Sequence, residues 1–351
     1  MTRFVIVSAL AALNVAAASF AGIIVVNGVA ERDYGKPIAV QNTQTQFGDS
    51  NIGQVGFANG SELDGLFAAN PGAEGGAPAS FVLAGNLESN FNKLEIFIDY
   101  KPGGQNKLRG DNPDVDFNGL NRMGDNGGGN GLRFDADFAA DLYITVTGGN
   151  TGNNQYSSFA NLAEIRTDGG GFGTFVGGGG EGANAISNPG LGLTIAVNNS
   201  NVRGVTGGDG VAKGTGVNTG IEFSIDVAAL QNSIADIAEW GNHPVRIVAF
   251  VNGGGHDFAS NQFLAGIGGG SNLGEPRNID LGLIDGNQFV TVFEPASSIP
   301  GDLDGDGSVN GADLSILLGS WGACSGCAAD LNNDGFVDGA DLSILLGGWT
   351  G

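Results

Sequence analysis

Ten oxygen-bearing side chains near the end of the sequence recur with one spacing. They stand at positions 1, 3, 5, 9 and 12 of residues 302–313, and again in residues 330–341. The two sets are Asp302, Asp304, Asp306, Asn310 and Asp313, then Asp330, Asn332, Asp334, Asp338 and Asp341. A curled loop with this spacing supplies alternate oxygens to a hard cation, and position 7 adds a main-chain carbonyl, here of Ser308 or Phe336. The pattern therefore predicts two calcium ions, one in each loop.

Glycine and duplication support the same interpretation. Gly307 and Gly335 stand at position 6, where a calcium loop turns sharply through a conformation that costs other residues energy. Residues 302–321 and 330–349 align at an offset of 28, with 15 of 20 positions identical. So close an internal repeat indicates two copies of one structural unit.

Each loop is followed by apolar residues at helical spacing. They recur at i, i+3, i+4 and i+7 as Leu314, Leu317, Leu318 and Trp321, and as Leu342, Leu345, Leu346 and Trp349. This spacing predicts one amphipathic helix behind each loop. We expect Val309 and Val337, at loop position 8, to point inward and pair the two loops.

The alternative is an acidic surface turn that binds no metal. Residues 301–351 contain eight aspartates and no Lys, Arg or Glu, which gives a net charge of −8. Without a cation these carboxylates repel one another, and so short a segment buries too little apolar surface to offset the repulsion. Calcium binding is therefore favoured.

The ends of each repeat differ from those of an ordinary EF-hand. Position 12 carries Asp rather than Glu, and residues 295–300 hold helix breakers in place of an entry helix. A duplicated loop with only its exit helix resembles the type I dockerin family over residues 301–351. The resemblance implies a module that folds on calcium and docks onto a cohesin-type domain of a polysaccharide-degrading assembly.

The docking positions of this module are unlike those of cellulosomal dockerins. Those carry Ser/Thr-type residues at loop positions 10 and 11 and a Lys-Arg pair in the helix. Here the loops read Gly311-Ala312 and Gly339-Ala340, and the helices read Leu318-Gly319 and Leu346-Gly347. Packing of this apolar face on a neighbouring domain of the same chain therefore stays open beside cohesin binding.

The two cysteines, Cys324 and Cys327, lie between the repeats. A C-x-x-C pair can be a redox site, half a zinc site or a short disulfide. With only His243 and His256 elsewhere and no second cysteine pair, zinc is disfavoured. In an exported chain we expect a disulfide that tightens the connection between the repeats.

The beginning of the chain predicts export. Thr2-Arg3 is a short positive region, residues 4–18 are apolar apart from Ser8 and Asn14, and residues 19–21 form a small-x-small cleavage site. We expect a signal peptide over residues 1–21, no membrane-spanning segment, and a mature chain that is secreted or held at the cell surface. A net charge of −23 argues against nucleic-acid partners.

Residues 22–294 are rich in glycine, yet short strand-like stretches separate the glycine runs. These stretches are residues 81–84, 94–99, 142–146, 193–197, 221–225, 245–251 and 289–293. Strands joined by glycine-rich turns predict an antiparallel β-sandwich rather than a disordered coil. One helix is expected from Val227 to Trp240, with Asp226 as its N-cap, and residues 295–300 are expected to form a linker.

Several stretches of this segment resemble the sandwich group of family-nine carbohydrate-binding modules and DOMON domains. They are NGVAERDYG, LEIFIDY, GIEFSIDVAAL and VRIVAFVN. The resemblance implies a sugar or haem ligand. Trp240, Tyr100, Tyr143 and Tyr156 are candidates for sugar stacking, with core packing as the alternative. His243, His256 and Met123 are too few and too scattered to nominate haem ligands.

Two further sets of acidic residues remain open. Asp111, Asp114, Asp116, Asn118 and Asp125 form either a further calcium site in a sandwich loop or a solvated turn. A glycosidase would need two acids in one cleft, and the spacing of the glutamates selects no pair. The glutamates are Glu88, Glu95, Glu164, Glu222 and Glu239.

The sequence offers no catalytic set of residues to name. It therefore predicts a secreted, non-catalytic module that binds a glycan or a surface in polysaccharide degradation and is joined to a calcium-binding dockerin. The alternative is a structural or adhesion protein whose calcium repeats rigidify or attach the C-terminus.

Overall fold

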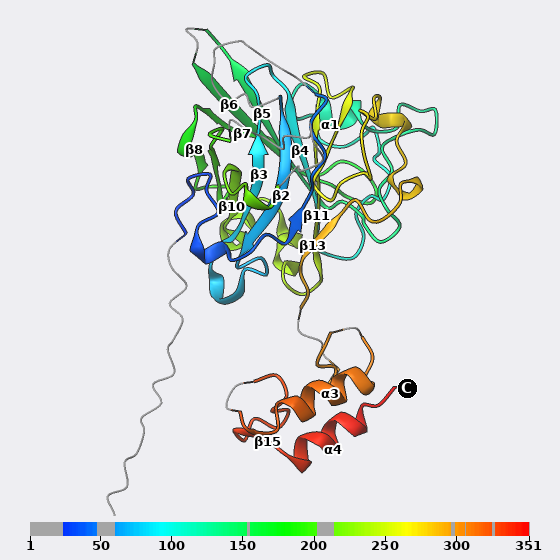
Figure 1. The fold of residues 1–351 in the computed structure, drawn as a ribbon. Helices are drawn as coiled ribbons and strands as arrows, with labels where there is room; N and C mark the ends of the chain where they lie inside the picture. Colours follow the sequence, from blue (N-terminus) through cyan, green and yellow to red (C-terminus); the bar gives the residue numbers. More distant parts are fainter. Residues whose placement is uncertain are drawn as a thin grey trace, which may run out of the picture.

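The computed structural model describes residues 24–47, 60–152, 155–201, 214–295, 299–305, 307–324 and 327–350. Among them the fold is mainly β, with a small helical module at the C-terminal end (Figure 1). The expected signal peptide lies outside these residues, as does Asp306.

Two antiparallel sheets form the large unit. The first sheet has the strand order β1-β2-β3-β10-β9-β8. Its strands are β1 (Ala39–Val40), β2 (Glu62–Ala69), β3 (Ala79–Asn86), β10 (Gly220–Ile225), β9 (Leu193–Val197) and β8 (Gly182–Asn188). The second sheet has the order β12-β11-β4-β5-β6-β7, with β13 also paired to β11. Its strands are β12 (Ala259–Phe263), β11 (Val245–Asn252), β4 (Lys93–Asp99), β5 (Leu142–Asn150), β6 (Tyr156–Glu164), β7 (Gly173–Gly179) and β13 (Val290–Phe293).

Short helical segments connect the strands. They are α1 (Gly119–Arg122), α2 (Val227–Leu230) and the 3-10 turns η1 (Arg32–Tyr34), η2 (Glu74–Gly76), η3 (Gly214–Gly216), η4 (Ala235–Glu239), η5 (Pro276–Asn278) and η6 (Leu281–Leu283).

The main core lies between the two sheets. Successive side chains of a strand point to opposite faces, so Leu94, Ile96 and Ile98 of β4 enter this core and are fully buried. Phe81 of β3 and Phe223 of β10 enter it from the first sheet and stack, with ring centroids 5.0 Å apart. The sandwich expected from the sequence is confirmed.

A second core covers part of the outer face of the second sheet. Phe97, Tyr143 and Phe250 point outward from their strands, yet all three are fully buried. Side chains from the long connection between β4 and β5, including Phe134 and Phe138, close over them. Because this layer covers only part of the face, the sheet leaves the outer surface of β5–β7 for other contacts.

All seven strand-like stretches lie in or overlap strands of the structure, namely β3, β4, β5, β9, β10, β11 and β13. The single helix expected over Val227–Trp240 is wrong. The chain forms α2, leaves helical geometry at Ile234 (φ −126°, ψ 98°) and continues as η4. The Asn232 side chain donates to the Ala229 carbonyl (3.0 Å), a local bond that competes with helix propagation, although Asp226 caps the first turn as expected.

The C-terminal module contains α3 (Gly311–Gly319), α4 (Gly339–Gly347), β14 (Gly322–Ala323) and β15 (Phe336–Val337). Both helices follow their loops as expected, but each ends before the tryptophan, so Trp321 and Trp349 are exposed. The module has a small core of its own, made by Val309, Leu317, Ala329, Val337 and Leu345. No helix in the described ranges is long and apolar enough to cross a membrane.

Candidate metal centre

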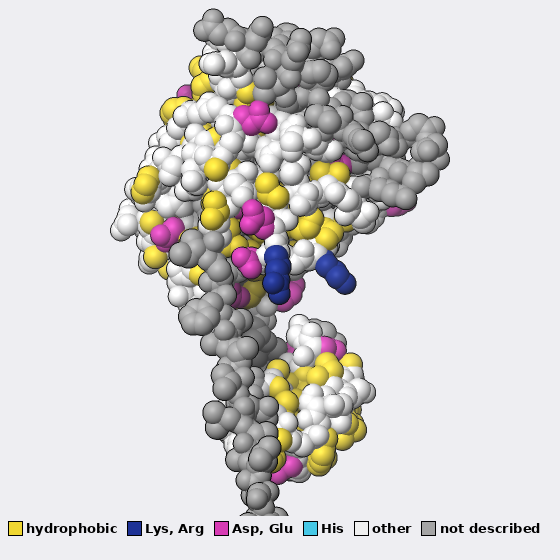
Figure 2. All heavy atoms as spheres, turned by 60° about the vertical axis from the view of Figure 1, so that its left-hand side comes forward, with side chains coloured by type: hydrophobic (Ala, Val, Ile, Leu, Met, Phe, Trp, Pro, Cys, Tyr) yellow, Lys and Arg dark blue, Asp and Glu magenta, His cyan; other side chains and the backbone are white. Residues whose placement is uncertain are grey.

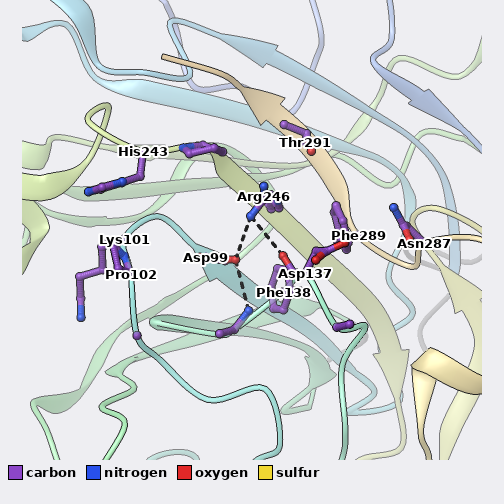
Figure 3. A pocket seen from close by; sticks show the side chains of 14 residues that line it. Asp99, Lys101, Pro102, Asp137, Phe138, His243, Arg246, Asn287, Phe289 and Thr291 are labelled. Carbon is purple, nitrogen blue, oxygen red and sulfur yellow. Dashed lines mark hydrogen bonds and ion pairs between the residues drawn. The ribbon is translucent and has the colours of Figure 1, made fainter. Parts of the chain in front are cut away.

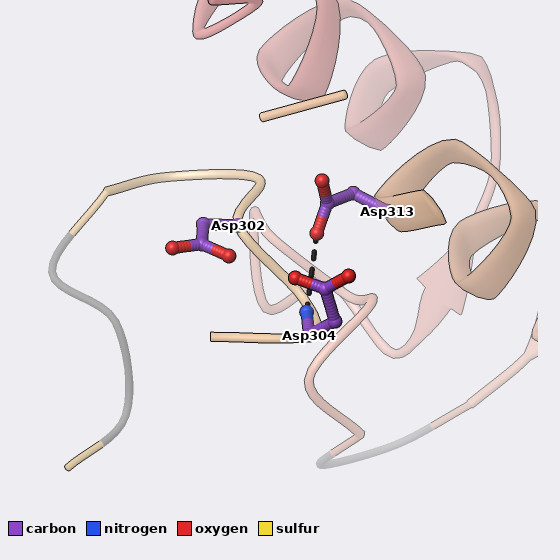
Figure 4. A group of neighbouring side chains, drawn as sticks. All are labelled: Asp302, Asp304 and Asp313. Carbon is purple, nitrogen blue, oxygen red and sulfur yellow. Dashed lines mark hydrogen bonds between the residues drawn. The ribbon is translucent and has the colours of Figure 1, made fainter. Parts of the chain in front are cut away.

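The first predicted loop brings three carboxylates together. One oxygen from each of Asp302, Asp304 and Asp313 lies within 4.8 Å of the others (Figure 4). Asp302 and Asp313 are buried, whereas Asp304 is exposed. Buried acids that face one another are costly unless they are paired, so this arrangement suits a cation.

Backbone N–H groups fix the two buried carboxylates. Asp313 accepts from the N–H groups of Leu303 (2.6 Å) and Asp304 (3.1 Å) through one oxygen. Its other oxygen accepts from the N–H group of Asn310 (2.8 Å). Asp302 accepts from the N–H groups of Gly305 and Gly307, both at 2.9 Å. The chain itself therefore curls the loop around its acids.

The second loop repeats this arrangement. Asp330 accepts from the N–H groups of Asp334 (3.0 Å) and Gly335 (2.8 Å). Asp341 accepts from those of Leu331 (2.8 Å), Asn332 (3.2 Å) and Asp338 (2.8 Å). Gly307 and Gly335 both have positive φ, +86° and +91°, as position 6 requires. Position 3 of this loop is Asn332 rather than an acid, and its side-chain N–H donates a hydrogen bond to the Asp334 carboxylate (2.9 Å).

Position 12 is electrostatically prepared for a cation. Burial raises the pKa of Asp313, but the N–H groups of Asn310, Asp304 and Leu303 outweigh it and hold that pKa below its usual value. The pKa of Asp341 is lowered as well, first by the N–H group of Asp338. Both closing carboxylates are therefore anionic at neutral pH.

Position 9 has a local role as well. Asn310 and Asp338 are the N-caps of α3 and α4, and each accepts from the N–H group two residues on at 2.8 Å. Asp313 and Asp341 complete a capping box at each helix. The structure therefore joins loop and helix through shared residues. Sequence spacing marked these residues as ligands but did not reveal the cap.

The two repeats are joined differently from the pairing expected of their valines. Val309 exchanges hydrogen bonds with Thr350, backbone to backbone and backbone to hydroxyl, both at 2.9 Å. Val337 pairs with Gly322 instead. Both valine side chains point inward into the shared core, as expected, and are fully buried there. Their backbones tie each loop to the segment behind the other repeat's helix.

The inter-repeat connection contains the two cysteines. The sulfurs of Cys324 and Cys327 are bonded, and both residues pack against the small core. The Cys324 N–H group donates to the Gly335 carbonyl (2.9 Å), which links the disulfide to the second loop.

The acidic cluster of the sandwich is dispersed. Asp111 is exposed and forms a bidentate pair with Arg109 (2.8 and 2.6 Å), whereas Asp116 is buried against Lys93 (2.9 Å). Asp125 accepts from the backbone of its own glycine-rich turn. Among the described residues the only grouping of three potential metal-binding acids is that of the first C-terminal loop. A further calcium site in this cluster is therefore not supported.

The aromatic stacking candidates lie in the interior. Tyr100 and Tyr143 are fully buried, and Tyr156 and Trp240 are each 6% exposed. Trp240 stacks on Tyr100 at 5.4 Å, and its indole N–H donates to the Pro71 carbonyl. Core packing, the alternative weighed for these residues, is what the structure has.

The glutamates considered as a catalytic pair have separate partners. Glu95 contacts His256 and Tyr143, Glu222 accepts from Tyr34, and Glu164 pairs with Arg166. Glu88 is fully buried and accepts from Asn90, and Glu239 lies near His243. None of these five residues lines the hollows of about 580, 550 and 520 Å³ in the described part of the sandwich.

One large hollow, of about 580 Å³, lies beside Arg246 (Figure 3). The Arg246 guanidinium lies 5.6 Å from the centre of the Phe289 ring, 3.5 Å from Asp99, and donates to the Asp137 carbonyl (3.1 Å). The Arg246 guanidinium is thus engaged with the wall of the hollow rather than aimed into the space.

Comparison with known proteins assigns the C-terminal module alone. Residues 300–346 match the family model of the dockerin type I domain. No curated protein and no solved structure matches the chain. The resemblance of residues 22–294 to sugar- and haem-binding sandwiches stays a prediction.

Proposed function

We propose that the C-terminal module binds one calcium ion in each loop and docks the chain onto a cohesin-type domain. The proposal starts from the match of residues 300–346 to the dockerin type I domain. Dockerins are calcium-binding modules whose partners are cohesins. The observation that carries the proposal is the pair of loops whose closing acids, Asp313 and Asp341, are each held by three backbone N–H groups.

The docking face that we infer is apolar and nearly two-fold. Leu318 and Leu346 occupy the same place in α3 and α4 and are 52% and 51% exposed, and Trp321 and Trp349 are exposed behind them. Figure 2 shows hydrophobic side chains gathered on this small module. Because residues 301–351 contain no Lys or Arg, we expect a cohesin with an apolar recognition face rather than one that reads basic side chains.

The test uses the full chain and a panel of immobilised cohesin domains, in calcium and in EGTA. We expect calcium-dependent capture by at least one cohesin, lost in a Leu318→Asp/Leu346→Asp variant. Ser343→Ala, an exposed change on α4, is the matched control. Capture that persists in EGTA, or a panel that captures nothing, would refute docking through this module.

We further propose that residues 22–294 are a non-catalytic, glycan-binding cargo and that the chain acts outside the cell. The five glutamates have separate partners, and none of them lines the hollow beside Arg246 or the hollow over Phe117, which supports a binding role over hydrolysis by a glutamate pair. Reducing-sugar release from soluble polysaccharides tests this directly. Turnover that survives purification and is lost on a glutamate substitution would overturn it.

The rival function is attachment to an envelope through the same apolar face. It is favoured by Leu318-Gly319 and Leu346-Gly347, where cellulosomal dockerins carry charged recognition residues. Co-sedimentation with cell envelopes that depends on Leu318 and Leu346, without capture by any cohesin, would favour this function.

A further inference from the structure

The outer face of the second sheet carries an aromatic pocket that the sequence did not reveal. Its volume is about 550 Å³, and it lies over β4–β7, beyond the layer that covers the rest of this face. Lys93, Thr147, Asn161 and Phe175 reach it from these strands, at positions that alternate with the main core. The pocket is therefore built on a rigid sheet.

Four phenylalanines form the walls: Phe91, Phe117, Phe159 and Phe175. Phe117 is 100% exposed and Phe175 57% exposed. Within the described residues none of these four rings stacks on another ring, whereas many rings of the two cores are paired. Exposed aromatic rings around a hollow mark a binding site more often than a packing defect.

The floor is polar and well ordered. The Lys93 ammonium lies 2.9 Å from Asp116 and donates to Thr147 (2.9 Å), and Lys93 and Asp116 are both at least nine-tenths buried. Asn161 is 5% exposed, and its side-chain amide makes no hydrogen bond within the described part of the chain. Because Asn161 lines the pocket, a ligand there can supply hydrogen-bond partners to this amide.

A second layer holds the floor in place. His256 lies between Asp116 (Nε2–Oδ2 3.1 Å) and Glu95 (Nδ1–Oε1 2.8 Å), and Tyr143 donates to Glu95 (2.6 Å). Burial lowers the pKa of His256, but the charges of Glu95 and Asp116 outweigh burial and raise it to about 9. Two cationic and two acidic groups therefore balance below the pocket.

The backbone beside the pocket is strained. Asp116, Phe117 and Asn118 all have positive φ (+47°, +55° and +66°), a region that non-glycine residues seldom occupy. The buried contacts of Asp116 hold this turn, which carries Phe117 to the rim. Strain of this kind persists where the surrounding structure enforces it, and it collects at binding sites.

Three ligand classes can be compared on this geometry. An anion gains little, because Asp116 and the nearby Asp114 offset Lys93. A pure hydrocarbon would bury the floor and leave the Asn161 amide unsatisfied. A sugar ring offers an apolar C–H face to the phenylalanines and hydroxyl groups to Asn161, Lys93 and Asp116.

We infer that this pocket binds a neutral sugar residue of a glycan, with Phe117 and Phe175 against its faces and Asn161 as a hydrogen-bonding partner at the floor. The inference rests on the proposed glycan-binding function and assigns that function a site.

The test is isothermal titration of the full chain with cellohexaose, xylohexaose, mannohexaose and laminarihexaose, beside a hexamer of galacturonic acid as the anionic probe. We expect at least one neutral hexasaccharide to bind. Phe117→Ala and Asn161→Ala should each weaken it about tenfold or more, and Phe117→Tyr should retain binding. The control is Leu283→Ala, because Leu283 is equally an exposed apolar residue (84%) and lies outside the pocket.

Each outcome decides something. Neutral-sugar binding that is unchanged in Phe117→Ala and Asn161→Ala overturns the pocket but keeps the glycan-binding function. Binding of none of the neutral sugars overturns both, whereas capture by cohesins is tested separately. Binding of the galacturonic-acid hexamer alone, or of the apolar dye N-phenyl-1-naphthylamine without displacement by sugars, shows that the ligand class is wrong.

Discussion

The most direct perturbation of the calcium module is Asp313→Ala. This carboxylate is fully buried and accepts from three backbone N–H groups, at 2.6, 3.1 and 2.8 Å. Leaving three such donors without an acceptor costs about 3 kcal/mol, at the low estimate of about 1 kcal/mol each. If the free calcium concentration is about a hundred times the Kd of the loop, losing the ion removes about 2.7 kcal/mol more.

Together these losses exceed the ~3–5 kcal/mol that a core of this size supplies. We therefore expect Asp313→Ala to prevent the module from folding in calcium, while the sandwich stays folded. Titration calorimetry of the full chain should give two calcium ions per wild-type chain and at most one in the variant.

Two controls separate this effect from a general loss of charge. Asp111→Ala removes an exposed carboxylate that pairs with Arg109 in the sandwich, so the calcium stoichiometry should stay at two. Asp341→Ala removes the equivalent ligand of the second loop and should also lower the stoichiometry. Two ions with unchanged affinity in Asp313→Ala would refute the assignment of this carboxylate as the closing ligand.

Three further predictions concern stability. The pKa of His256 is about 9 in the folded state against an ordinary value of 6.5. Its contribution to the free energy of unfolding, about 3 kcal/mol, is therefore present below pH 6.5 and lost as the pH rises through 9. Denaturant unfolding at a series of pH values should show this decline for the wild type and not for His256→Gln, and the same pH dependence in both proteins would contradict the ion network. Gly85→Ala should destabilise the sandwich by on the order of 3 kcal/mol, because φ is +144° and a Cβ would overlap the Glu62 carbonyl. Gly270→Ala, with open space around it, is the control in thermal unfolding. Equal melting temperatures of the two variants would count against the pairing of β2 with β3 at Gly85. The Cys324–Cys327 disulfide closes a short loop, with a sequence separation of 3. Its reduction should lower the stability of the module by about 2 kcal/mol and thereby weaken calcium binding. The same calcium affinity before and after reduction would show that the disulfide has no such role.

Local pattern was sufficient where a strand is rich in β-branched residues. The stretches in β4, β5 and β11 are rich in Ile, Val and aromatic residues and were predictable. By contrast, β7 reads GTFVGGG and β8 reads GANAISN, which have little strand propensity of their own. Their pairing with β6 and β9 is a tertiary effect, so a single sequence could not indicate them.

The ligand site escaped prediction for a related reason. Tyr143 points outward from its strand, yet the layer formed by the β4–β5 connection buries it completely. Phe117 looks like an ordinary core residue in the sequence, and only the left-handed turn after Asp116 leaves it fully exposed. The long connections between strands thus determine which aromatic residues face solvent. The conformation of these connections cannot be predicted from local periodicity.

The two units differ in how they balance buried charge, and this difference sets the effect of calcium. In the sandwich, Glu95 and Asp116 are opposed by His256 and Lys93, so the floor of the pocket needs no ion. In the C-terminal module, Asp302, Asp304 and Asp313 lie close together, and backbone N–H groups donate to the two buried acids. The segment from 301 to 351 has no Lys or Arg side chain to oppose them. Chelation should therefore abolish docking while sugar binding by the full chain keeps its affinity. A loss of sugar binding in EGTA would mean that the pocket depends on the calcium module.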